Sequence, residues 1–203
     1  MKPIIKVCGM RDADNIREVE GLGIDLMGFI CWEHSPRYVS EVPAFLPVSC
    51  KRVGVFVNPT LDYIQERCKA FGFNLIQLHG SESPDFCQET KALTGLRIIK
   101  AFNISTAEDL EKTRAYEGFA DCFLFDTKGK SAGGNGEKFD WSILHDYKGN
   151  TPFLLSGGIG PEDARRLSKF HHDKCLGFDI NSRFEKAPGI KDVEAIKQFL
   201  SYE

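Results

Sequence analysis

The sequence lacks any long hydrophobic run, and no stretch approaches the roughly 20 apolar residues that a helix needs to cross a bilayer. It also lacks an excess of basic residues, because 26 Lys and Arg face 29 Asp and Glu and the net charge is -3. Nucleic-acid binding usually requires a basic face, so we expect neither a nucleic acid nor a membrane as a partner. The N-terminal Met-Lys-Pro leads into a strand-like run without the three-part layout of a signal peptide, which indicates a cytoplasmic protein.

Paired cysteine motifs are also absent. The seven cysteines are an odd number and contain no CxxC pair, which favours free thiols in a reducing compartment over a disulfide framework. The five histidines show no metal-ligand spacing. We therefore expect no bound metal.

Glycine, by contrast, is abundant, and much of it follows short apolar runs. Among the 19 glycines, Gly9, Gly80 and the pair Gly157-Gly158 each come directly after such a run. Helix-start signals stand between the runs, as at Ser83-Pro84 and near Asp192. The runs rich in β-branched or aromatic residues number eight, and they lie near residues 3–8, 25–31, 52–57, 74–79, 96–102, 121–126, 152–156 and 175–180.

Strands that alternate with helical segments in this way pair in parallel. Eight such units predict a single (β/α)8 TIM barrel, with residues 1–203 forming one domain. Because a typical barrel has about 250 residues, this one must be compact with short helices, especially after the second strand. An open doubly wound sheet is the alternative, but such a sheet seldom needs eight equal units.

The ends of the predicted strands carry the candidate catalytic residues, since barrels build their sites at the C-terminal ends of their strands. Cys8 ends the first strand, where a thiol can serve as a base or nucleophile, although a free cysteine is more often a small buried hydrophobe. Asp126 ends the sixth strand after an apolar run, where partial desolvation favours the neutral carboxyl and makes it a proton donor. A turn or cap is the alternative role for Asp126.

Other strand ends carry candidate binding residues. Gly157-Gly158 after the seventh strand and Asn181-Ser182 after the eighth occupy the usual phosphate corner of these barrels, which predicts a small phosphorylated substrate. His79 either faces the pocket or caps its strand. Lys100 is either a Schiff-base lysine or a partner in a salt bridge.

Taken in order, these segments resemble the phosphoribosylanthranilate isomerase family. The matching motifs extend over residues 6–192, nearly the whole chain. They are Lys6-Val7-Cys8-Gly9-Met10, Ser35-Pro36-Arg37, Val53-Gly54-Val55-Phe56-Val57-Asn58, Gln77-Leu78-His79-Gly80-Ser81-Glu82, Phe125-Asp126, Gly133-Gly134-Asn135-Gly136, Phe139-Asp140-Trp141, Leu155-Ser156-Gly157-Gly158-Ile159, Phe178-Asp179-Ile180-Asn181-Ser182 and Pro188-Gly189-Ile190-Lys191-Asp192.

The resemblance implies a cofactor-free isomerase of tryptophan biosynthesis that catalyses an Amadori rearrangement. It implies Cys8 as general base, Asp126 as general acid and Arg37 as the residue that holds the anthranilate carboxylate. The glycine-rich segment after the sixth strand would close over the substrate. Arg183 departs from the family, which usually has glycine there, so it either assists the phosphate or points away.

Two alternatives remain open from the residues: a Schiff-base aldolase that uses Lys100, and a non-enzymatic module that binds a phosphorylated ligand. A thiol and a carboxyl at one rim are superfluous for a binding module. We expect a monomer or a homodimer.

Overall fold

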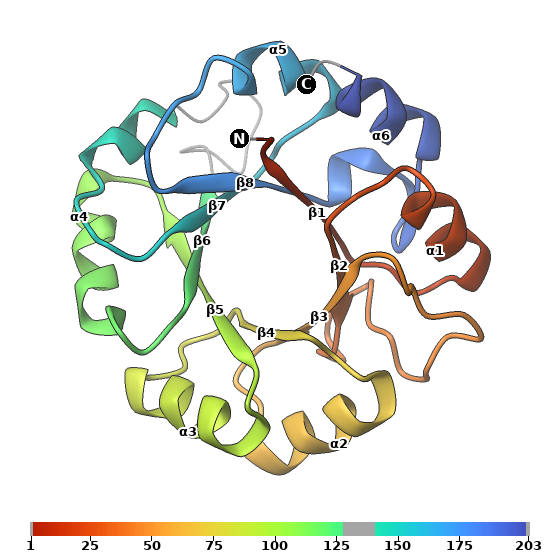
Figure 1. The fold of residues 1–203 in the computed structure, drawn as a ribbon, viewed down its shortest axis with the longest axis horizontal. Helices are drawn as coiled ribbons and strands as arrows, with labels where there is room; N and C mark the ends of the chain where they lie inside the picture. Colours follow the sequence, from red (N-terminus) through yellow and green to blue (C-terminus); the bar gives the residue numbers. More distant parts are fainter. Residues whose placement is uncertain (1, 128–140, 202–203) are drawn as a thin grey trace.

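A computed structural model describes residues 2–127 and 141–201 of the chain. Its eight main strands close into a parallel barrel in the order of the sequence, and Figure 1, which looks along the barrel, shows them as an inner ring inside the helices. The predicted barrel is therefore confirmed. The strands are β1 (Ile4–Cys8), β2 (Leu26–Ile30), β3 (Lys51–Phe56), β4 (Leu75–Leu78), β5 (Arg97–Ile104), β6 (Cys122–Thr127), β7 (Phe153–Ser156) and β8 (Cys175–Ile180).

Several helices begin at side chains that bond to backbone N–H groups of the first turn. Asp12, Thr60 and Ser83 each accept a hydrogen bond from the N–H three residues further on, which satisfies one of the donors that a helix start leaves without a partner. The α-helices are α1 (Ala13–Glu20), α2 (Leu61–Phe71), α3 (Pro84–Thr94), α4 (Ala107–Glu111), α5 (Ala164–Leu167) and α6 (Val193–Leu200). Short 3-10 helices are η1 (Lys112–Tyr116), η2 (Trp141–Asp146), η3 (Pro161–Asp163) and η4 (Ser182–Phe184), and a small antiparallel ribbon joins β9 (Glu185–Ala187) to β10 (Ile190–Lys191).

The prediction of a short helix after the second strand is wrong. Residues 31–50 contain no helix, and Figure 1 shows an irregular loop between β2 and β3 where the barrel's outer layer would have one. Pro36, Pro43 and Pro47 divide this segment into pieces shorter than a stable helix, since each proline removes an N–H donor and restricts the residue before it.

Alternation along the strands separates two apolar layers. Side chains of one parity fill the barrel, among them Val55, Ile99 and Leu124. Side chains of the other parity, such as Phe29 and Phe123, pack under the surrounding helices. This parity decides which polar side chains enter the barrel and which face the helices.

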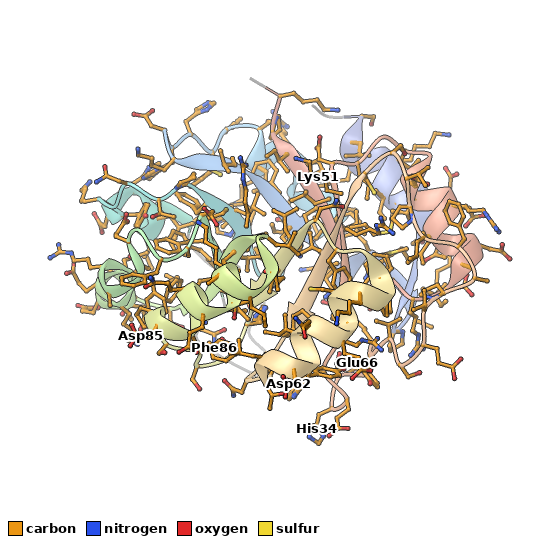
Figure 2. All side chains as sticks on the ribbon, turned by 60° about the horizontal axis from the view of Figure 1, so that its bottom comes forward. His34, Lys51, Asp62, Glu66, Asp85 and Phe86 are labelled. Carbon is orange, nitrogen blue, oxygen red and sulfur yellow. The ribbon has the colours of Figure 1, made fainter. Side chains whose placement is uncertain are left out.

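The two ends of the barrel differ. Figure 2 places Lys51, the first residue of β3, at one end, and His34, in the loop after β2, at the other. Asp62 and Asp85, in the first turns of α2 and α3, lie toward the end marked by His34. This is the end where all eight parallel strands finish, and the candidate site lies there.

Within residues 2–127 and 141–201, no helix combines the length and apolar character needed to cross a membrane. The longest, α2 and α3, have 11 residues each.

Candidate active site

A cavity of about 300 Å³ opens at the C-terminal ends of the strands. Every predicted site residue except Arg37 lines it, although these residues come from five different strand ends. Parallel closure of the barrel brings them to one rim. The lining residues are Cys8, Ile30, Val55, Gln77, His79, Asp126, Ser156, Gly157, Gly158, Ile159, Asp179, Asn181 and Ser182.

The Cys8 thiol is buried at the end of β1, beside β2. Cys8 pairs in register with Gly28, and a Cβ built on Gly28 would lie 2.8 Å from the sulfur. Only glycine at this position therefore leaves room for the thiol to lie between the two strands. This neighbour could have been found in the sequence only by pairing the first two strands in the correct register.

Two lysines and a carboxylate surround this thiol. Lys6, two residues before Cys8 and on the same face of β1, bonds through Nζ to Asp179 Oδ1 at 2.8 Å, and both side chains are buried. Burial raises the pKa of Cys8, while the positive charges of Lys6 and Lys191 oppose that rise. The net result is a pKa above that of an ordinary thiol, so the ligand-free protein holds Cys8 mainly as the thiol at neutral pH.

Arg37 lies beside the cavity and is not among its lining residues. Its Nε donates to both carboxylate oxygens of Glu185 at 2.9 and 3.0 Å, and its Nη2 donates to Glu185 Oε2 at 2.7 Å. Lys191 Nζ bonds to the same carboxylate at 2.6 Å and to Asn181 Oδ1 at 2.7 Å. Burial would raise the pKa of Glu185, but the hydrogen bonds from Arg37 and Lys191 outweigh it and lower that pKa. Glu185 thus fixes the guanidinium at the mouth of the cavity.

Asp126 stands across the rim on β6. One of its oxygens, Oδ2, lies 3.6 Å from His79 Nε2, and the other ring nitrogen, Nδ1, lies 2.8 Å from Gln77 Nε2. The Asp126 side chain is 18% exposed, so it reaches the cavity while remaining largely shielded from solvent. A carboxyl in this position is suited to proton transfer to a ligand in the cavity.

Gly157 and Gly158 line the cavity after β7, and both have positive φ, +96° and +63°. A Cβ on Gly157 would overlap the backbone of Thr127 at the end of β6, whereas a Cβ on Gly158 would meet nothing within 4 Å. Glycine is therefore required at position 157, because the ends of β6 and β7 approach each other closely there. At Gly158 no side chain or neighbouring group covers the backbone on the Cβ side, and the residue lines the cavity.

Alanine at these two glycines should separate the two effects. Both substitutions carry the positive-φ cost of about 1–2 kcal/mol. We expect Gly157→Ala to lower the free energy of unfolding by roughly 1–3 kcal/mol more than Gly158→Ala, because only the former overpacks. Urea unfolding of both variants measures this difference. Equal losses would show that the contact with Thr127 is unimportant.

Arg183, the departure from the family pattern, folds back over the glycine pair. Its Nη2 lies 2.5 Å from Glu162 Oε1 and its Nη1 lies 3.4 Å from the carbonyl oxygen of Gly158. The guanidinium therefore lies against the Gly157-Gly158 loop. Whether Arg183 assists a phosphate stays a prediction, because its guanidinium is engaged by Glu162 and the Gly158 carbonyl.

Lys100 does not face the cavity, which contradicts the Schiff-base alternative. Its neighbours Ile99 and Ala101 occupy the barrel interior, so alternation turns Lys100 toward the helices. There its Nζ lies 3.1 Å from Glu82 Oε2 and 2.7 Å from the carbonyl oxygen of Gly80. The lysine is thus a buried salt-bridge partner that ties the end of β4 to β5.

Several groups around the cavity were not predicted from the sequence. Gln77, Lys6 and Asp179 stand two residues before His79, Cys8 and Asn181, so strict alternation places each pair on one face. Glu185 and Lys191 had no such signal, because they meet Arg37 and Asn181 through the β9–β10 ribbon. The predicted glycine-rich segment over the substrate, residues 129–136, lies outside the described residues.

A larger hollow of about 890 Å³ lies at the opposite end, between the starts of β1 and β8 and helices α5 and α6. Its walls include Phe170, Leu176 and Phe199. Size alone does not identify a site, and the smaller cavity is preferred because it gathers a thiol, a carboxyl and an imidazole at the strand ends.

Fold and cavity together define the class of protein, a (β/α)8-barrel enzyme with its ionisable groups at the C-terminal ends of the strands. Residues 5–202 match the family model described as N-(5'phosphoribosyl)anthranilate (PRA) isomerase. Because this match covers almost the whole chain, the chain belongs to the N-(5'-phosphoribosyl)anthranilate isomerase family.

Individual relatives support the same family assignment. The chain is 50% identical over 203 residues to N-(5'-phosphoribosyl)anthranilate isomerase of Parabacteroides distasonis, with 97% of this chain and 91% of the relative covered. The enzyme of Phocaeicola vulgatus is 48% identical over 198 residues, with coverage of 98% and 96%. The crystal structure of phosphoribosyl anthranilate isomerase from Thermotoga maritima superposes with a TM-score of 0.84 at 30% identity, covering 99% of this chain and 98% of that chain. The resemblance drawn from the motifs is confirmed.

A second solved structure shows what a relative binds. It is a phosphoribosyl anthranilate isomerase in complex with reduced 1-(o-carboxyphenylamino)-1-deoxyribulose 5-phosphate, with a TM-score of 0.84, 29% identity and coverage of 99% and 98%. That relative therefore accommodates a phosphorylated sugar joined to a carboxyphenylamino group.

Proposed function

We propose that this protein converts N-(5'-phosphoribosyl)anthranilate into 1-(2-carboxyphenylamino)-1-deoxyribulose 5-phosphate, a step of tryptophan biosynthesis, without a cofactor. The observation that carries the proposal is that Cys8 and Asp126 line one cavity of about 300 Å³ together with the Gly157-Gly158 loop. A base, an acid and a phosphate corner are the three parts that this rearrangement needs.

The phosphate is assigned to the corner formed by the β7 and β8 loops. Gly158 offers open backbone there, and Asn181-Ser182 line the same cavity. Backbone N–H groups at such a corner bind a phosphate without a lysine ligand. The guanidinium of Arg183 lies beside this loop in an ion pair with Glu162.

The first chemical step belongs to Asp126. The neutral carboxyl gives its proton to the ring oxygen of the ribose while the C1'–O bond breaks, and the nitrogen lone pair forms a C1'=N⁺ iminium. This step opens the ring and leaves Asp126 as a carboxylate. His79, 3.6 Å from that carboxyl, is placed to interact with the charge that develops.

The second step belongs to Cys8. The iminium acidifies the hydrogen on C2', and the Cys8 thiolate removes it to give an enolamine, which tautomerises to the ketone. The positive charge of the iminium joins those of Lys6 and Lys191 in favouring the thiolate over the thiol. The resting thiol has given its proton to solvent before this step, and uptake of the C2' hydrogen makes Cys8 a thiol again. Asp126 recovers its proton from solvent, so both groups regain their starting states.

Arg37 is assigned to the anthranilate carboxylate. Its Nε and Nη2 are held by Glu185, which fixes the plane of the guanidinium at the cavity mouth. The other edge of the guanidinium, Nη1 and the second N–H of Nη2, can bind a carboxylate through two parallel hydrogen bonds, which an ammonium group does not reproduce.

We expect Arg37→Lys to raise KM roughly 10- to 100-fold with a smaller effect on kcat, because a charge-assisted hydrogen bond contributes about 1.5–3 kcal/mol. Steady-state kinetics on the purified variant measure both constants. Arg17→Lys on the exposed face of α1 is the matched control and should leave KM unchanged. An unaltered KM in Arg37→Lys would contradict the assignment.

The activity itself is tested by generating phosphoribosylanthranilate in situ and following its fluorescence. The wild-type protein should consume the signal at a rate proportional to protein concentration. Stabilisation of the protein by the substrate without any loss of fluorescence would instead indicate a binding module. A monomer or a homodimer remains our prediction for the assembly. One solved relative, 27% identical with a TM-score of 0.81, is described as generated monomers of the dimeric phosphoribosylanthranilate isomerase of Thermotoga maritima.

A further inference from the structure

Three side chains form a row from the inside of the barrel to the rim. Gln77 and His79 lie two residues apart at the end of β4, so both point into the cavity, and Asp126 faces them from β6. Gln77 Nε2 is 2.8 Å from His79 Nδ1, and His79 Nε2 is 3.6 Å from Asp126 Oδ2. The mechanism above uses Asp126 and leaves Gln77 without a role.

Gln77 is unusual because it is fully buried with its amide oxygen unpaired. The side chain is 0% exposed, and Oε1 has no hydrogen-bond partner within the part of the chain that the structure describes. Leaving a buried acceptor without a partner costs about 1–3 kcal/mol. Rotation of the amide by half a turn would exchange the two groups and bring Oε1, in place of Nε2, to the His79 ring.

The two orientations of the amide demand different forms of His79. If the amide nitrogen faces Nδ1, it donates, so Nδ1 must be the unprotonated nitrogen and Nε2 carries the hydrogen. If the oxygen faces Nδ1, that nitrogen must carry a hydrogen instead. Only the first arrangement lets a neutral imidazole point an N–H at Asp126.

We propose that Gln77 is a positioning residue that holds His79 as the Nε2–H tautomer and thereby directs a hydrogen-bond donor at Asp126 Oδ2. With Oδ2 accepting from His79, the acidic proton of the neutral carboxyl resides on Oδ1. As that proton leaves, the same N–H stabilises the new carboxylate. At 3.6 Å a small shift of either side chain brings the N–H within hydrogen-bond distance of Oδ2.

The tautomer can be observed without any turnover. Nitrogen-15 NMR of the ligand-free wild-type protein distinguishes protonated from unprotonated imidazole nitrogens, and a His79→Asn variant assigns the signals among the five histidines. We expect Nε2 of His79 to be protonated and Nδ1 to be a hydrogen-bonded, unprotonated nitrogen. In Gln77→Met, the Nδ1 signal should move toward that of an unbonded nitrogen. A protonated Nδ1 in the wild-type protein would overturn the proposal.

Kinetics supply the second measurement. Gln77→Met keeps the length of the side chain and removes the donor, and we expect kcat to fall about 10- to 100-fold, as when the outer partner of a functional histidine is removed. Gln88→Met on the exposed face of α3 is the matched control and should keep the wild-type kcat. Equal kcat values for Gln77→Met and Gln88→Met would also overturn the proposal.

The effect on kcat rests on the proposed function, whereas the tautomer does not. If Asp126→Asn kept full turnover, the proposed acid would be wrong, yet the NMR signature of His79 would still be the one determined by Gln77. If Asp126→Asn lost turnover while Nδ1 proved to be protonated, the acid would stand and the role of Gln77 would be wrong. The two failures are therefore distinguishable.

Discussion

Replacement of Asp126 by asparagine is expected to lower kcat by about 10²- to 10⁴-fold, the range that a positioned general acid contributes. Asparagine has nearly the same shape as aspartate but has no carboxyl proton to give to the ring oxygen. The Asp126 side chain is 18% exposed, so its replacement should leave the fold intact. The variant should still bind the product, which a thermal shift with added product would measure alongside kcat.

The control for this variant is a residue next to the same strand. Asp121, just before β6 at the other end of the barrel, bonds through Oδ1 to Lys91 at 2.5 Å and accepts the N–H of Ile98 at 2.8 Å. Asp121→Asn should cost some stability and leave kcat unchanged. Comparable kcat values for Asp126→Asn and Asp121→Asn would remove Asp126 from the mechanism.

Replacement of Cys8 by serine should have an effect of similar size, about 10²- to 10⁴-fold in kcat. A serine hydroxyl fits the space beside Gly28, but it remains protonated at neutral pH and is a poor base. Cys122→Ser is the matched control, because Cys122 lies at the start of β6, away from the rim. Retained turnover in Cys8→Ser would show that another group removes the C2' hydrogen.

The pH dependence of the Asp126→Asn variant provides a second test of this role. In the wild-type enzyme a rise in pH gains the Cys8 thiolate but loses the protonated acid, whereas in Asp126→Asn only Cys8 is left to titrate. Burial raises the pKa of Cys8, and Lys6 and Lys191 only partly offset that rise. The residual kcat/KM of Asp126→Asn should therefore increase with pH, about tenfold per unit while the pH stays below the thiol pKa. Measurement of that kcat/KM from neutral to mildly alkaline pH tests the sign, and a decrease over that range would contradict a thiolate base.

The strands and the rim were predictable because they depend on local signals. Short apolar runs followed by glycine mark the buried parallel strands, and the rule that barrels carry function at strand ends selects Cys8 and Asp126. The capping residues Thr60 and Ser83 likewise stand in the sequence just before their helices. Such features involve residues only a few positions apart, so one sequence suffices to find them.

What the sequence did not reveal depends on distant pairing. The partner of Arg37 is Glu185, 148 residues later, and no local pattern connects them. For Lys100 the residues left two roles open, and the salt bridge is the one found. Its partner Glu82 lies on the helix side of β5, an orientation that alternation from Ile99 determines. The helix after β2 is absent because three prolines interrupt the segment, and their effect outweighs the alternation of strands and helices elsewhere in the chain.

The ion pair between Lys6 and Asp179 joins positions 173 residues apart and spans the seam where β1 meets β8. During synthesis Cys8 leaves the ribosome early, because it stands near the N-terminus. The charged side chains around it are complete only after β8, which carries Asp179, has been made. Polypeptides that stop before residue 179 would carry the sulfur without the carboxylate that holds Lys6 in place. Prematurely terminated chains should therefore be inactive, and activity should appear only when all eight strands of the barrel are present.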